Sequence, residues 1–181
     1  MTGRLVVLSG PSGVGKDTVL NRWQERNPRV SRVVACTTRP PRTGEVDGVD
    51  YTFLSREEFL QRAAEGAFLE FKEVHGNFYA TPLAAMEQML SEGRIVVLKI
   101  DVQGALDVMK LRPDAVTILL LPPSQEECER RIRARATDSD EVILRRLENM
   151  RFELAQAPHY QHTVVNDDLE RCVDEIEALI A

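Results

Sequence analysis

A glycine-rich segment directly after the first apolar run constrains the fold more than any other feature of this sequence. The run Leu5–Leu8 has the length of a buried strand, and residues 10–16, GPSGVGK, then match the pattern G-x-x-x-x-G-K. Between a strand and a helix, such glycines let backbone N–H groups surround phosphate oxygens, while the helix N-terminus and the lysine add favourable charge. We therefore predict a phosphate-binding loop, because an ordinary turn requires neither the lysine nor this spacing.

Three further apolar runs follow along the chain, separated by stretches of helical character. They lie at Ile95–Ile100, Val116–Leu121 and Thr163–Val165. Continuous apolar runs of this length are typical of strands buried on both faces of a parallel sheet, with crossover helices on each side. With 181 residues, 43% of them apolar, and no internal repeat or long linker, the chain is predicted to form one α/β domain.

Local signals mark the starts of several helices. Ser55 and Ser124 are each followed three residues later by a glutamate. This is the spacing of a capping box, in which a hydroxyl and a carboxylate satisfy the free backbone N–H groups of the first turn. Thr81 and Pro82 are expected to supply a cap and then a proline at the first helical position.

Two segments interrupt the alternation of strands and helices. Between about Thr37 and Ala80, short aromatic pieces are separated by glycines and predict a small, mostly antiparallel insert. These pieces are Tyr51–Leu54, Phe68–Val74 and Phe78–Ala80. From Arg130 to Arg146 the chain is rich in arginine and is expected to form a mobile cover.

Charge and cysteine spacing exclude several classes of partner. The formal net charge of -6 argues against broad binding to nucleic acid or to an anionic membrane, and no stretch approaches the roughly 20 apolar residues of a membrane span. Cys36, Cys128 and Cys172 are too scattered to indicate a disulfide framework or a zinc site. His159 and His162 have no metal-ligand pattern beside them. We expect a cytoplasmic protein with no nucleic-acid or membrane partner.

The residue after the loop lysine departs from the usual motif. Position 17 is Asp17, where a serine or threonine hydroxyl commonly reaches Mg²⁺, and Thr18 follows it. Mg²⁺ keeps several waters and needs few protein carboxylates, so Asp17 is a candidate ligand through a bound water. As a carboxylate at a helix start it could equally be structural, and Thr18 could bond the α-phosphate instead.

A second candidate anion site lies at Arg39 and Arg42, which are separated by two prolines that stiffen the backbone. Guanidinium groups bind phosphate in a bidentate way. The surrounding stretch Thr37–Tyr51, TTRPPRTGEVDGVDY, resembles the GMP-binding signature of the guanylate kinases. The similarity runs from the phosphate loop through residues 68–79, Ile100–Gly104 and the arginine-rich segment to residues 165–168, which is nearly the whole chain.

The resemblance implies a three-layer α/β P-loop kinase fold with a parallel five-stranded core sheet, a small mixed or antiparallel GMP-binding insert and a helical lid. Within one domain, residues 1–181, the expected parts are a core of about 1–34, 84–124 and 150–181, an insert of about 35–83 and a lid of about 125–149. It also implies phosphoryl transfer from ATP to GMP or deoxy-GMP, with Mg²⁺ as cofactor. A monomer and a homo-oligomer are both compatible with the sequence.

Roles for individual residues follow from the same resemblance. Glu70 is expected to read the base, because an ionised carboxylate offers two acceptors to the N1–H and N2–H₂ donors of guanine, which adenine does not present. The residues expected to bind GMP are Arg39, Arg42, Tyr51, Glu70, Tyr79, Thr81 and Asp101. Those expected to bind ATP are Gly10, Pro11, Ser12, Gly13, Val14, Gly15, Lys16, Asp17, Thr18 and Asn166. Those expected to be catalytic are Lys16, Arg39, Arg131, Arg135 and Arg146, the last three as part of the lid.

The sequence departs from the family pattern at further positions. Ala35 and Ala80 stand where serine and glycine are common, and Lys99 stands where an acidic residue usually precedes the Ile-Asp pair. Two implied roles have simpler alternatives. Asp101 could serve merely as the cap of the following helix. Asn166, the expected partner of adenine, could be a turn-forming residue.

Two other functions remain open on sequence grounds. A guanylate-kinase-like interaction module would keep the fold without turnover, but Lys16, Arg39 and Arg42 are all present. A related P-loop kinase acting on a phosphorylated sugar is suggested by Asp17 and disfavoured by Glu70. An ADP-release assay with several nucleoside monophosphates and a sugar phosphate distinguishes the three.

Overall fold

A computed structural model describes residues 2–134 and 139–181, and within these residues the larger sheet has five strands, all parallel. Its order is β2 (Val30–Arg32), β7 (Ile95–Lys99), β1 (Arg4–Ser9), β8 (Val116–Leu121) and β9 (His162–Val165). The parallel core sheet predicted from the apolar runs is therefore confirmed. The short edge strand β2 was not predicted, because three residues give no clear apolar period.

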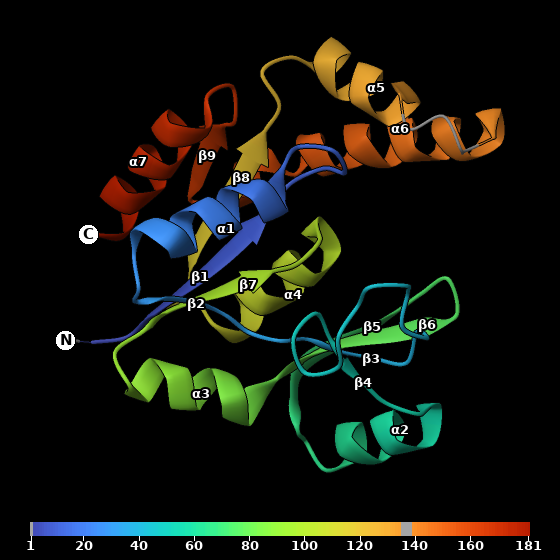
Figure 1. The fold of residues 1–181 in the computed structure, drawn as a ribbon, viewed down its shortest axis with the longest axis vertical. Helices are drawn as coiled ribbons and strands as arrows, with labels where there is room; N and C mark the ends of the chain where they lie inside the picture. The colour runs from blue at the N-terminus through green and yellow to red at the C-terminus, as the bar shows by residue number, and fades with distance from the viewer. Residues whose placement is uncertain (1, 135–138) are drawn as a thin grey trace.

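Helices cover both faces of the core sheet and make three layers (Figure 1). α1 (Lys16–Arg26) and α7 (Leu169–Ile180) pack on one face, and α3 (Leu83–Ser91) and α4 (Val102–Leu111) pack on the other. Side chains of β1 alternate between two core clusters: Val6 and Leu8 face α1 and α7, while Leu5 and Val7 face α3 and α4. Burial on both faces explains why the strand is an unbroken apolar run.

The predicted insert forms a separate sheet in the order β4 (Thr52–Phe53), β3 (Cys36–Thr37), β6 (Asn77–Pro82) and β5 (Phe68–Val74). β6 pairs antiparallel with β3 and β5, whereas β3 and β4 run parallel, so the sheet is mixed. The helix α2 (Arg56–Ala64) packs against this sheet through Phe59, which belongs to a separate hydrophobic cluster of the insert. In that cluster the ring centre of Phe59 lies 4.7 Å from that of Phe68 and 5.1 Å from that of Phe78.

The arginine-rich segment forms a pair of helices, α5 (Gln125–Ala134) and α6 (Asp140–Ala155), followed by the one-turn 3-10 helix η1 (Ala157–His159). The two helices share a small core that includes Ile132 and Leu147. Figure 1 shows this pair and the insert projecting from the side of the core that lies away from both chain termini. α6 continues six residues beyond the expected lid boundary at 149.

Two of the three predicted helix starts are confirmed and one is wrong. The hydroxyls of Ser55 and Ser124 accept hydrogen bonds from the backbone N–H groups three residues later, at 3.1 and 3.0 Å. Thr81 caps nothing. It lies in β6, its hydroxyl donates to Glu70, and α3 begins at Leu83 with Pro82 at the N-cap position and no side-chain cap.

The structure bears on three expectations about class. Cys36, Cys128 and Cys172 are buried free thiols, as expected from their spacing. Within residues 2–134 and 139–181, no helix is long and apolar enough to cross a membrane. Nor do the described residues contain a cluster of three or more His, Cys, Asp or Glu side chains able to hold a metal ion.

Candidate active site

The phosphate loop connects the end of β1 to the start of α1, as its sequence context predicts. Gly15 is the N-cap of α1 with φ of 92°, a left-handed conformation that side chains rarely adopt. A Cβ on Gly10 would lie 2.8 Å from the carbonyl oxygen of Leu120, so this position also requires glycine. The backbone can therefore curl closely at the N-terminus of an 11-residue helix, where N–H groups attract anions.

Lys16 lies folded back over this loop, with its ammonium donating a hydrogen bond to the carbonyl oxygen of Gly10. Burial lowers the pKa of Lys16, and the negative charge of Glu153 is the largest opposing influence. Glu153 comes from α6, and burial raises its pKa to about 7 while Lys16 lowers it. The charge of the loop lysine is thus influenced by a carboxylate that the sequence analysis did not single out.

Asn166 follows β9 and supports the loop from the side. Its Nδ2 donates a hydrogen bond of 2.8 Å to the carbonyl oxygen of Val14, and the same nitrogen would lie 2.8 Å from a Cβ on Gly15. The structure thus places this residue against the loop backbone. Its expected contact with adenine stays a prediction.

Substitution of Asn166 by alanine is expected to weaken binding of ATP about tenfold, because the loop loses a hydrogen bond of roughly 1.4 kcal/mol. Titration calorimetry with ATP and with inorganic tripolyphosphate separates the two roles. Loop support predicts equal losses for both ligands, whereas an adenine contact predicts a loss for ATP alone. Asn149→Ala, at an exposed position of α6, is the matched control.

Two of the three expected lid arginines reach the phosphate loop. Arg131 of α5 donates to the carbonyl oxygen of Gly13 at 3.3 Å and to Glu127 at 3.0 Å. Arg146 of α6 donates to the hydroxyl of Ser12 at 2.8 Å. The third, Arg135, lies outside the described residues. The helical pair therefore already brings two guanidinium groups to the loop that is built to hold phosphates.

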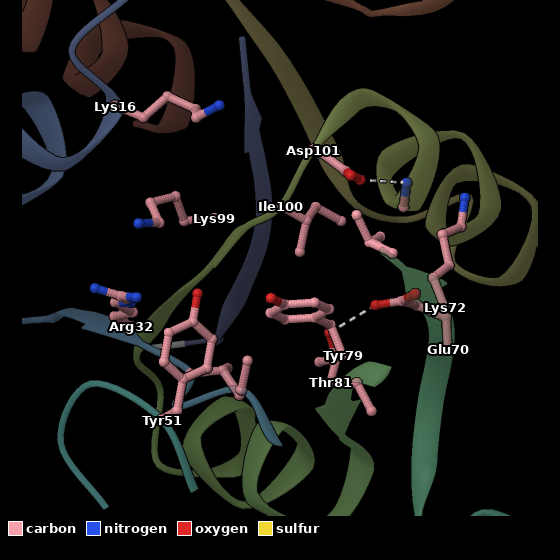
Figure 2. Close-up of a pocket in the computed structure, with 15 residues that line it drawn as sticks. Lys16, Arg32, Tyr51, Glu70, Lys72, Tyr79, Thr81, Lys99, Ile100 and Asp101 are labelled. Atoms are coloured by element: carbon pink, nitrogen blue, oxygen red, sulfur yellow. Dashed lines mark hydrogen bonds between the residues drawn. The ribbon is translucent and has the colours of Figure 1, made fainter. Parts of the chain in front are cut away.

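A first cavity of about 310 Å³ lies between the phosphate loop and the insert sheet. Figure 2 shows Glu70 on one side of it, Lys16, Lys99 and Arg32 on the other, and the rings of Tyr51 and Tyr79 between them. The expected site residues that line this cavity are Lys16, Tyr51, Glu70, Tyr79, Thr81 and Asp101. Residues far apart in the sequence are thereby brought to one cavity.

Glu70 is the partly buried carboxylate of this cavity, and its chemistry depends on its surroundings. The buried hydroxyl of Thr81 donates to its Oε1 at 3.0 Å, as the dashed line in Figure 2 marks. Burial raises the pKa of Glu70 to about 7, and the Thr81 hydrogen bond and Lys72 oppose that rise. The cavity thus holds an acceptor whose charge is poorly solvated and which gains from a ligand that supplies hydrogen-bond donors.

A second cavity of about 730 Å³ adjoins the first and shares Arg32, Tyr51 and Lys99 with it. Both expected phosphate ligands, Arg39 and Arg42, line it.

Arg39 is preorganised in this second cavity. Its guanidinium donates to both oxygens of Glu45 at 2.8 and 2.9 Å and lies 5.2 Å from the centre of the Tyr51 ring. The hydrogen bond from Arg39 lowers the pKa of Glu45 to about 2, so this carboxylate stays ionised at neutral pH.

The two aspartates near the loop differ in what they contact. Asp101 lines the first cavity and also caps α4, because its Oδ1 accepts from the N–H of Gly104 at 2.9 Å. Asp17 lies in the first turn of α1 with 65% of its side chain exposed, and it pairs with Lys99. One exposed carboxylate beside a phosphate loop fits Mg²⁺, which is usually held by one or two carboxylates, waters and substrate phosphates.

Sequence reasoning missed several side chains of the site. Glu45 lies inside the quoted signature but received no role, and Glu153 lies in a helix whose position was unknown. Arg32 and Lys99 end the neighbouring strands β2 and β7. Ligands of parallel sheets bind beyond the carboxyl ends of the strands, so this placement was the available signal for Lys99. For Arg32 the strand itself had not been recognised.

The fold and the site define a class of protein: a P-loop phosphotransferase, with a phosphate loop beside two adjoining cavities. Comparison with known proteins narrows this class. A family model described as guanylate kinase matches residues 2–181. The chain therefore belongs to the guanylate kinase family.

Individual relatives agree with the family match. A guanylate kinase of Synechococcus sp. (strain JA-3-3Ab) is 48% identical over 178 residues, which cover 98% of this chain and 82% of that protein. A guanylate kinase of Clostridium perfringens (strain SM101 / Type A) is 47% identical over the same shares. The crystal structure of guanylate kinase from Anaplasma phagocytophilum matches with a TM-score of 0.79 and 37% identity, covering 99% of this chain and 85% of that one.

Proposed function

We propose that this chain transfers the γ-phosphoryl group of ATP to GMP, giving ADP and GDP, with the donor on the phosphate loop and the acceptor in the two adjoining cavities. Membership of the guanylate kinase family makes it a phosphotransferase. The observation that carries the proposal is the placement of Glu70, paired with Thr81, across one cavity from Lys16. The base-reading group and the phosphate-binding group face the same space.

Guanine recognition follows from what Glu70 can accept. The N1–H and N2–H₂ donors of guanine match two carboxylate oxygens, while the unprotonated N1 of adenine would face an acceptor and leave it without partners. A buried acceptor that lacks its donors is costly, so a site of this kind discriminates by orders of magnitude. None of the base contacts named here involves the 2′-hydroxyl, so deoxy-GMP is included as an acceptor.

Phosphoryl transfer requires positioning and neutralisation of charge more than covalent chemistry. The acceptor phosphate lies between Arg39, Arg42 and the loop, so that one of its oxygens attacks the γ-phosphorus in line. Lys16 leaves the Gly10 carbonyl for the β- and γ-phosphates, and Arg131 and Arg146 approach from the lid helices and exclude water. Mg²⁺, held through Asp17 and water, supplies further neutralisation of the phosphate charge when bound.

An ADP-release assay with GMP, deoxy-GMP, AMP, CMP, UMP and a sugar phosphate as acceptors tests the proposal. The expected result is turnover with GMP and deoxy-GMP at rates at least a hundredfold above the others. Turnover with a sugar phosphate instead would assign a different acceptor, and binding of GMP without turnover would indicate an interaction module.

The raised pKa of Glu70 predicts a pH dependence for recognition of the base. Below about pH 7 the carboxyl is protonated and loses acceptor capacity, so the dissociation constant of guanosine should rise, approaching tenfold per pH unit. Guanosine is used because it carries no phosphate that titrates in this range. Calorimetry between pH 5.5 and 8 measures the slope. In Glu70→Gln the slope should vanish, and a wild-type affinity independent of pH would contradict the assignment.

A further inference from the structure

Lys99 ends β7 and lies at the junction of the two cavities, each of which it lines. Only 18% of its side chain is exposed, so the ammonium is held within the site rather than in bulk solvent. Figure 2 shows its side chain on the same side of the first cavity as Lys16 and Arg32, opposite Glu70. No role follows for Lys99 from the mechanism described above.

The ammonium of Lys99 is anchored by Asp17, which lines the second cavity only. The two side chains form a hydrogen-bonded ion pair, and Arg32 lies 3.8 Å from the same carboxylate oxygen. An ammonium has three donors, so one bond to Asp17 leaves donors for a ligand. The ion pair also joins the first turn of α1 to the end of β7, which fixes the lysine in one place.

The arrangement of the two cavities indicates which anionic group would lie beside Lys99. A nucleoside monophosphate with its base at Glu70 in the first cavity and its phosphate towards Arg39 and Arg42 in the second must pass the junction. The junction carries Lys99, Arg32 and Tyr51, and the two cations there favour negative charge. The α-phosphate of the acceptor is the negative group of that molecule.

We propose that Lys99 is a further ligand of the acceptor phosphate, held in position by Asp17. The inference rests on the proposed function, since it places the base of the acceptor at Glu70. It assigns Lys99 to the phosphate end of the acceptor, and it assigns Asp17 a positioning role that does not require a metal.

Binding of GMP and of guanosine to the whole chain, measured by calorimetry in magnesium-free buffer with a chelator, tests the proposal. For Lys99→Met we expect the dissociation constant of GMP to rise about tenfold while that of guanosine changes less than twofold, because a lost cation affects only the phosphate. Lys99→Arg, which keeps the charge, should recover part of the GMP affinity.

Lys72→Met is the matched control, because Lys72 lines the same first cavity but lies beside Glu70 and pairs with Asp107 at 3.1 Å. It should change the two affinities in parallel. Asp17→Asn should weaken GMP binding in the wild-type background and have no effect on it in Lys99→Met, since Asp17 acts through the lysine. Equal losses of GMP and guanosine in Lys99→Met, or no loss, would overturn the inference. Failure of the unaltered chain to bind GMP would instead overturn the proposed function.

Discussion

Substitution of Lys16 by alanine is expected to lower the turnover number about a thousandfold. In the proposed mechanism Lys16 is the cation at the β- and γ-phosphates, and loss of one such charge at a transferring phosphoryl group costs about two to three orders of magnitude. Steady-state rates with saturating ATP and GMP measure the effect. GMP binding in the absence of ATP should change far less, because the acceptor is held chiefly by residues of the insert.

The fold should survive this substitution, because Lys16 in the unliganded chain is a partly buried cation whose removal relieves a desolvated charge. Circular dichroism and thermal melting check the folded state. Lys110→Ala, at an exposed position in the last turn of α4, is the control for loss of a lysine and should retain full turnover. A Lys16→Ala variant that melts normally and keeps more than a tenth of the turnover would remove Lys16 from the mechanism.

Substitution of Glu70 by glutamine is expected to lower kcat/KM for GMP about a hundredfold or more while leaving the affinity for ATP within twofold. The amide replaces one acceptor by a donor, which then faces a donor of guanine and leaves both unpaired. The loss should appear equally with deoxy-GMP. Glu73→Gln is the matched control, because Glu73 lies on the same strand and is exposed. Parallel losses for GMP and ATP in Glu70→Gln would contradict the role of base reader.

The same substitution should stabilise the unliganded protein. The pKa of Glu70 rises from 4.5 to about 7 on folding, so the protein loses stability as pH increases from 4.5 to 7, and the loss is complete above 7. A shift of this size corresponds to about 3 kcal/mol at most, and we expect about 2 kcal/mol, or roughly 5 °C in Tm, at pH 8. Thermal melts should show the gain vanish below about pH 4.5. A destabilised variant at pH 8 would mean that the carboxylate is well solvated.

Much of the fold could be predicted because the strands of the core are buried on both faces and therefore unbroken in apolar character. The predicted bounds of β8 and β5 coincide with those observed. The strands β2 and β3 were missed because elements of two or three residues are set by their partners across the sheet, not by their own pattern. Thr81 was misinterpreted for a related reason: its hydroxyl donates a hydrogen bond to Glu70, which is eleven residues away, and does not cap the adjacent helix.

The site was predictable to the extent that motifs carry it. The phosphate loop and the two arginines of the insert lie in contiguous signatures, and the structure brings them to adjoining spaces. Glu153 and the Asp17–Lys99 pair could not be predicted, because each depends on which side chains of distant segments meet, whereas Glu45 depends on how the loop that carries Arg39 folds. Asp17 and Lys99 were each noted as a departure from the family pattern, but their contact is a property of the folded chain alone.

The supports of the phosphate loop come from the opposite end of the chain. Asn166 bonds the loop backbone, and α1 behind the loop is tied to α7 by the indole of Trp23 on Glu177 and by Arg26 on Asp174 at 2.6 Å. These contacts join segments that are about 150 residues apart in the sequence, so the short motif is completed by side chains that no local pattern specifies. A change in α7 can therefore alter nucleotide binding without touching the phosphate loop, because it acts through α1 behind the loop.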